Sequence, residues 1–163
     1  MMRVDHEEVL ARNPILLARC FWHLAQHYGA AADGRAPPLP LFVIAAAMLF
    51  HAESVEKIRR MQFDSGLLKV VTERPDLLAG LQRRLEASFE PSVIALQVAV
   101  SADLLKREGG EGFPTFRAEG SNLPIPLRDQ PHQGAMTAAA KRLGTWFAGE
   151  PIAVIQRQLA LEF

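Results

Sequence analysis

The chain has 163 residues, 49% of them hydrophobic, with 18 basic and 18 acidic side chains and a single cysteine, Cys20. This length and composition fit one globular domain that needs no disulfide, and they exclude a disordered or disulfide-rich protein. Each half of the chain carries nine charges of each sign, so nothing indicates strong non-specific attraction to nucleic acid, although a local basic patch stays open.

The ends and the apolar segments set the expected location. The longest apolar run, Leu39–Phe50, is too short to span a bilayer, which takes roughly 20 residues. The segment Met1–Glu8 has acidic residues where a signal peptide has an apolar core. One cysteine suits a reducing compartment. We therefore expect a soluble, cytoplasmic protein that does not enter a membrane.

Two helices are expected in the first 50 residues. Asn13-Pro14 is a typical helix start, because asparagine caps amides and proline suits the first helical position. Apolar residues then recur at three- and four-residue spacing, and Gly29 begins a loop: Leu17, Cys20, Phe21, Leu24 and Tyr28. The run Leu39–Phe50 lacks alternation and predicts a buried helix.

Shorter helices follow in the middle of the chain. One opens at Ser54, with Val55, Ile58 and Met61 directed inward. A helix beginning near Leu67 should end near Pro75, since the residue before proline avoids helical geometry. Leucines 77 to 85 mark another apolar stripe. Pro91 then predicts the start of a helix reaching Arg107, apolar on nearly all sides and so expected at the centre.

Two short strands, Phe113–Ala118 and Leu123–Leu127, are expected to form a hairpin through residues 119–122. Its prolines would confine it to a sheet edge. Helices are predicted at 135–148 and from Pro151. The fold class is thus mainly α, a compact single domain over 1–163, with a helical part (5–107), a hairpin (113–127) and C-terminal helices (135–158). The order of helix and hairpin resembles the end of a winged helix.

Few residues suggest chemistry. Cys20, His23 and His27 share one helix edge at a spacing that could hold zinc, but no second cluster supplies a fourth ligand. We interpret them as structural, and likewise His51, a histidine at the end of the apolar helix. Gly109–Gly112 lacks the strand, helix and lysine of a phosphate-binding loop and predicts a helix cap and turn. No catalytic residue, metal or cofactor is predicted, and an enzyme is the least favoured hypothesis.

Four basic pairs lie near polar helix faces, where solvent exposure is the simplest interpretation; a partner or DNA surface stays open. They are Arg59-Arg60, Arg83-Arg84, Lys106-Arg107 and Lys141-Arg142.

Several stretches resemble a known family. They are Asn13–Leu17, Leu39–Phe42 running into His51, and Arg142–Ala148, in that order. Together they resemble the middle component of three-component ABC ATPase systems, which include the small subunit of Lamassu-type anti-phage defence. The Leu-Gly-x-Trp-Phe-Ala stretch is the most specific. The family often has a proline where this chain has Ala47, and a longer segment of small residues after the Trp-Phe pair.

The resemblance implies a non-catalytic subunit lying between an ABC or SMC-like ATPase and an effector, often a nuclease, with DNA as an indirect partner through the complex. Its motif residues are expected to be fold determinants: Asn13, Pro14, Leu39, Pro40, Gly144, Trp146 and Phe147. Candidate partner contacts are Trp146, Arg142, Arg83 and Arg84. The helical spacing places Phe147 in the core and Trp146 at its edge, where the indole N–H can reach a polar group. The rival hypothesis is a winged-helix DNA-binding regulator.

Overall fold

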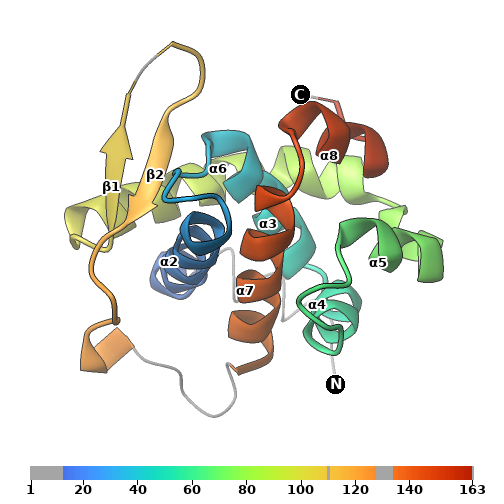
Figure 1. The fold of residues 1–163 in the computed structure, drawn as a ribbon, viewed down its shortest axis with the longest axis horizontal. Coiled ribbons are helices and arrows are strands. Elements are labelled where there is room, and N and C mark those ends of the chain that lie inside the picture. Colours follow the sequence, from blue (N-terminus) through green and yellow to red (C-terminus); the bar gives the residue numbers. More distant parts are fainter. Residues whose placement is uncertain (1–12, 110, 128–133, 163) are drawn as a thin grey trace.

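The computed structural model describes residues 13–109, 111–127 and 134–162. Their elements follow one another as shown in Figure 1: α2 (Pro14–Ala31), α3 (Leu39–Leu49), α4 (Ala52–Arg59), α5 (Leu67–Glu73), η1 (Pro75–Leu78), α6 (Leu81–Ser101), β1 (Leu105–Glu108), β2 (Thr115–Ala118), η2 (Ile125–Leu127), α7 (Gly134–Ala148) and α8 (Ile152–Gln158). The prediction of a mainly helical domain with a short hairpin in the C-terminal half is confirmed. The N-terminal segment Met1–Glu8 and the first part of the predicted helical region, residues 5–12, lie outside the described residues.

Helix α3 is the centre of the domain. All its residues from Pro40 to Leu49 are buried, and it contacts α4, α6 and α7. The ring of Phe42 meets Phe21 of α2 edge to face, with 5.1 Å between the ring centroids. A helix that is apolar on every side has no face to turn to water, so its neighbours must surround it. The predicted buried helix is confirmed.

Helix α2 begins and packs as its sequence predicts. The Asn13 side chain accepts a hydrogen bond from the Leu16 amide at 3.0 Å, and Pro14 holds the first helical position. The predicted stripe from Leu17 to Tyr28 is buried throughout. Further along, Val55, Ile58 and Met61 are buried around α4, as predicted. Local signals therefore place these helices correctly.

The predicted helix start at Pro91 is wrong, because Pro91 lies inside one long helix, α6. A proline inside a helix removes one hydrogen bond and costs about 3 kcal/mol. The helix continues because buried residues keep three- and four-residue spacing on both sides of the proline; they are Leu81, Leu85, Ser88, Ser92, Ala95, Leu96 and Ala99. Burial of this continuous face outweighs the local cost.

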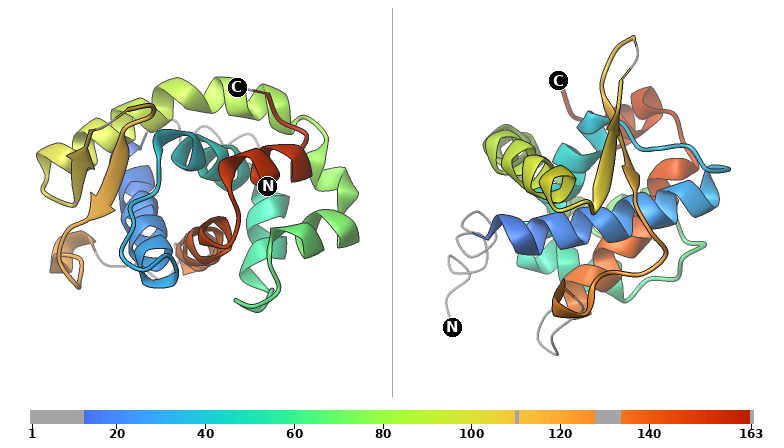
Figure 2. Two further views of the ribbon diagram at one scale, coloured as in Figure 1. Left: turned by 45° about the horizontal axis from the view of Figure 1, so that its top comes forward. Right: turned by 90° about the vertical axis from the view of Figure 1, so that its left-hand side faces the viewer.

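Helix α6 is also not the central helix that its apolar residues predicted. Ile94 is 43% exposed and Phe89 is 54% exposed, so only one face of α6 is buried. Figure 2 shows α6 as a long rod along one side of the domain, with the hairpin beside its C-terminal end. The helix ends at Ser101, and Asp103 takes a left-handed backbone conformation with φ 60°. The chain therefore leaves the helix six residues earlier than predicted.

The hairpin forms from a different pair of strands than predicted. Strand β1 pairs antiparallel with β2, and Leu105 lies opposite Ala118. The predicted partner, Leu123–Leu127, contains the 3-10 helix η2 instead. Pro124 and Pro126 lack the amide protons that a strand ladder needs, whereas Leu105–Glu108 has all of them. The prediction of a two-stranded hairpin is thus confirmed, but the prediction of which segment pairs with β2 is wrong.

The glycines near residue 110 consequently join two strands instead of capping a helix. Gly109 follows β1, and Gly112, with φ 86°, precedes β2, while Gly110 lies outside the described residues. Only glycine adopts that conformation without strain. The predicted helix cap at these glycines is wrong because α6 has already ended at Ser101.

The predicted C-terminal helices are confirmed as α7 and α8, with Pro151 as the N-cap of α8. Ile155 is buried, while Ile152 and Val154 are only partly buried. The sequence also predicts a loop through Pro131 before α7, and that loop lies outside the described residues. Within the described part of the chain, no helix taken alone combines the length and hydrophobicity needed to cross a membrane. Helices α3 and α4 meet those criteria only as a pair, and that pair is bent by 102°.

Candidate functional site

The motif residue Gly144 allows α7 to lie directly against α2, the most extensive helix contact in the described fold. A Cβ atom at Gly144 would lie 2.3 Å from the carbonyl oxygen of Leu24 and 3.0 Å from its carbonyl carbon. Both are backbone atoms, which cannot rotate away. The glycine is therefore required by the close approach of two helices.

Trp146 and Arg142 of α7 hold the loop between α4 and α5. The Trp146 indole N–H donates to the Phe63 carbonyl at 2.9 Å, and the Arg142 Nε donates to the Met61 carbonyl at 2.7 Å. The Arg142 guanidinium also lies 4.5 Å from the centroid of the Phe63 ring, within cation–π range. Trp146 is 5% exposed. These contacts fasten the loop to α7.

Phe147 points into the core, where it is fully buried, as the helical spacing predicts. The Trp146 N–H was predicted to reach a polar group, and in the structure that group is the Phe63 carbonyl. The structure thus places Gly144, Trp146 and Phe147 in packing roles. Whether Trp146 or Arg142 also contacts a partner subunit stays a prediction.

His27 supports the same loop from α2. Its ring stacks on Phe63 with 5.9 Å between centroids and an angle of 18°. Its Nδ1 donates to the His23 carbonyl at 3.1 Å. Burial lowers the pKa of His27, the nearby charge of Lys141 lowers it further, and the hydrogen bond to His23 opposes both. The ring is therefore more firmly neutral near pH 7 than an exposed histidine.

The other predicted motif, Leu39-Pro40, lies where the hairpin attaches to α3. The Leu39 amide donates to the Pro114 carbonyl at 2.9 Å, and the Phe116 amide donates to the Pro37 carbonyl at 3.1 Å. Pro38 forms an isolated bridge with Thr115. The hairpin is thus joined by its backbone to the start of the central helix.

The cysteine and histidines considered for metal do not come together. Cys20 is buried, while His23 and His27 are only partly buried. Within residues 13–109, 111–127 and 134–162, no group of three or more potential ligands is found. His51 is the N-cap residue of α4, and its Nδ1 lies 2.8 Å from the hydroxyl of Ser54 in the first turn of that helix.

The four basic pairs lie on four different elements, α4, α6, β1 and α7. Arg59 and Arg60 both pair with Glu56. Arg84 donates to three backbone carbonyls, those of Ala47, Leu77 and Ala79, whereas Arg83 is exposed. Arg84 therefore braces the ends of α3 and η1. Of the pair, Arg83 has the exposure that a partner contact needs.

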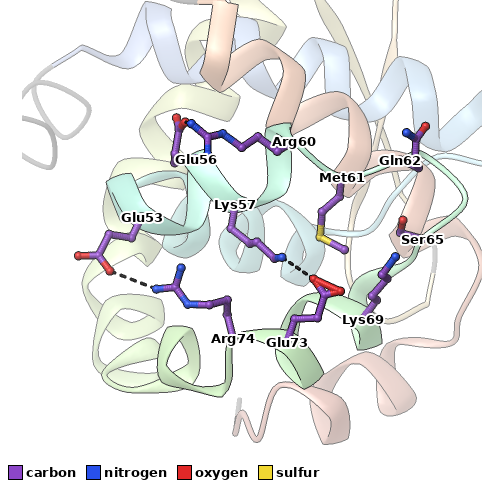
Figure 3. Close-up of a pocket in the computed structure, with 10 residues that line it drawn as sticks. All are labelled: Glu53, Glu56, Lys57, Arg60, Met61, Gln62, Ser65, Lys69, Glu73 and Arg74. Carbon is purple, nitrogen blue, oxygen red and sulfur yellow. Dashed lines mark hydrogen bonds and ion pairs between the residues drawn. The ribbon is translucent and has the colours of Figure 1, made fainter.

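A charged pocket of about 400 Å³ lies between α4 and α5 (Figure 3). Lys57 pairs with Glu73, and Arg74 pairs with Asp76 and, at 3.5 Å, with Glu53. The hydrogen bond from Lys57 holds the pKa of Glu73 below its ordinary value. Because Lys57 belongs to α4 and Glu73 to α5, their ion pair joins the two helices across the pocket.

An apolar groove of about 360 Å³ lies along α6, and sequence reasoning missed it. This α6 groove is lined by Leu39, Pro40, Val43, Gln82, Leu85, Glu86, Phe89, Phe113 and Glu162. Phe89 and Phe113 are 54% and 53% exposed. The sequence did contain a signal for this helix face, since Phe89 stands four residues after Leu85 and four before Val93. The predicted helix break at Pro91 hid that continuity.

The fold and its motif residues define a small, mainly helical domain in which α7 braces the loop before α5. The chain belongs to the family of the ABC-three component (ABC-3C) system Middle Component 3, whose model matches residues 1–163, the whole chain. The resemblance seen in the sequence is thereby confirmed, and it gives the protein an accessory role in a multi-component system. No curated protein and no solved structure matches the chain.

Proposed function

We propose that this chain is a non-catalytic subunit that bridges an ABC or SMC-like ATPase and an effector such as a nuclease, within a cytoplasmic anti-phage or anti-plasmid complex of the Lamassu type. The family match over the whole chain carries the proposal. ATP hydrolysis and DNA cleavage belong to the partners, and DNA is reached through the complex.

Two surfaces of the described residues support a bridging role. A bridge needs at least two contact areas, and the α6 groove and the charged pocket between α4 and α5 have no lining residue in common. Their chemistry also differs, since one exposes aromatic carbon and the other exposes paired charges. Different chemistry at two surfaces suits two different partners.

Co-purification tests the proposal. The ATPase encoded beside this chain is tagged and expressed with the effector and the chain, and then the chain or the effector is omitted in turn. We expect the ATPase and the effector to co-purify with each other only when this chain is present. The purified chain alone should hydrolyse ATP at background rate. An ATPase–effector complex that assembles equally well without the chain would contradict bridging.

The second candidate function is a winged-helix DNA-binding regulator, favoured by one observation. Helix α6 leads directly into the β1–β2 hairpin, and β1 carries the exposed residues Lys106 and Arg107. A salt titration of binding to random duplex DNA separates the two functions. Micromolar affinity at about 150 mM salt with a steep salt slope would favour the regulator. We expect weak binding, because the chain has no net charge.

A further inference from the structure

The α6 groove has an apolar floor and an acidic end. The floor is formed by α3 and α6 side chains, and the aromatic rings of Phe89 and Phe113 extend it toward solvent. Its charged lining residues are Glu86 and Glu162, and no lysine or arginine is among the residues that line it. Burial of such a surface is favourable, and the unbalanced acids would select a partner with basic side chains.

The acidic end is held in place by Gln82. Its side-chain amide donates to the Glu162 carbonyl at 3.0 Å and to the Glu86 carboxylate at 3.2 Å. Its carbonyl oxygen accepts from the Glu162 amide at 2.9 Å. One glutamine therefore uses both backbone groups of Glu162 and fixes a carboxylate beside them. Gln82 thus holds the Glu86 carboxylate and the backbone of the second acid, Glu162, on the same side of the groove.

The groove offers an occupant side chains and no strand edge. Its residues come from α3, α6, the hairpin loop and the C-terminal segment, and the backbone groups of Glu162 are already bonded to Gln82. An extended segment would bury backbone groups without partners, which is costly. A helix satisfies its own backbone. It can place apolar residues at three- and four-residue spacing in the groove and keep its polar face in water.

The length available also suits a helix. A second apolar groove of about 380 Å³ continues along α6 toward Ser101, and Leu39 lines both grooves. Helix α6 has 21 residues, which corresponds to about 30 Å. The second groove ends near Arg107, so the charge changes from acidic to basic along the whole surface. This polarity would fix the direction in which an occupant lies.

We infer that the α6 groove binds an amphipathic helix of a partner subunit, with apolar anchors on Phe89 and Phe113 and lysine or arginine residues beside Glu86 and Glu162. The inference rests on the proposed function, because it names the kind of segment through which one partner is bound.

A peptide experiment tests the chemistry on the full chain. The probe is a labelled amphipathic helix of about 20 residues with leucines on one face and lysines at one end, and its matched control carries glutamates in place of the lysines. We expect the basic peptide to bind, by fluorescence anisotropy, at least about tenfold more tightly than the acidic one. Phe89→Asp should weaken it about tenfold or more, as loss of an anchor does. Equal binding of both peptides would overturn the inference.

Matched variants separate the groove from general surface effects. Ile94 is 43% exposed on the same helix and does not line the groove, so Ile94→Asp should bind the basic peptide like wild type. Glu86→Lys should weaken binding, whereas Glu150→Lys, on a different surface, should not. Circular dichroism of each variant checks that the fold is kept. Equal loss in the groove variants and their controls would contradict the inference.

Co-purification distinguishes failure of the inference from failure of the proposed function. We expect Phe89→Asp to lose one of the two partners and Ile94→Asp to keep both. If wild type retains neither partner, the proposed function fails. If Phe89→Asp retains both as well as wild type does, bridging stands and the groove inference fails. A wild-type dimer that Phe89→Asp converts to a monomer would show that a second copy fills the groove, which also overturns the inference.

Discussion

Replacement of Gly144 by alanine gives a direct measure of how closely α2 and α7 approach. The added methyl group would lie 2.3 Å from the Leu24 carbonyl oxygen, and ordinary contact requires about 3.4 Å. The helices must therefore separate by about 1 Å, which loosens the packing along their shared face. Overpacking typically costs about 1–3 kcal/mol, and the backbone position of the clash favours the upper end. The higher helix propensity of alanine returns up to about 1 kcal/mol.

The net expectation for Gly144→Ala is a loss of about 1–2 kcal/mol in the free energy of unfolding. For a chain of this size each kcal/mol lowers the melting temperature by roughly 2–4 °C. Thermal and urea unfolding measure both quantities. The matched control is Gly29→Ala in α2, where the nearest atom to the new methyl would be 3.6 Å away. It should unfold at or above the wild-type temperature. If Gly144→Ala melts no lower than Gly29→Ala, the close helix crossing described above is wrong.

Three further predictions concern residues already described. Phe147→Ala should lower the free energy of unfolding by about 3–5 kcal/mol, because a fully buried ring is lost. Trp146→Phe should lower it by about 1 kcal/mol, because one hydrogen bond is lost. Urea unfolding of both variants measures the difference. Asn13→Ala should lower stability by about 0.5–2 kcal/mol in the same assay, through loss of the helix cap, with Asn13→Ser near wild type. Because the pKa of His27 is lower in the folded chain than in the unfolded chain, a drop in pH protonates His27 in the unfolded chain before it does so in the folded one. The free energy of unfolding should therefore fall as pH drops below about 6.5. Urea midpoints measured from pH 8 to 5 should fall less steeply in His27→Gln than in wild type.

The sequence predicted the elements whose signals are local. The cap at Asn13 and the uniformly apolar run Leu39–Phe50 specify their helices without reference to distant residues. The orientation of Phe147 followed from its spacing to Leu143. These predictions succeeded because the periodicity of a helix is already present within a few turns of sequence.

The predictions that failed depended on tertiary contacts. Pro91 indicates a boundary locally, yet the buried face that spans it keeps α6 continuous. Leu105 reads as a continuation of the apolar helix, and only its pairing with Ala118 shows that it belongs to a strand. The spacing of Phe89 from Leu85 indicated only the part of the α6 groove that lies on the helix itself. The groove also brings Phe89 together with Phe113 and Glu162, which are distant in sequence, and that tertiary contact could not be predicted.

The three backbone contacts of Arg84 affect how a search for the partner surface should be designed. Arg83 and Arg84 are neighbours of equal charge, so a scan of charged clusters would replace them together. The double variant would release the carbonyls at the ends of α3 and η1, and partial unfolding would then imitate a lost interaction. Arg83 should therefore be changed singly. Arg84→Lys serves as a separate test of fold stability, because a lysine ammonium cannot replace a planar guanidinium that donates to three carbonyls.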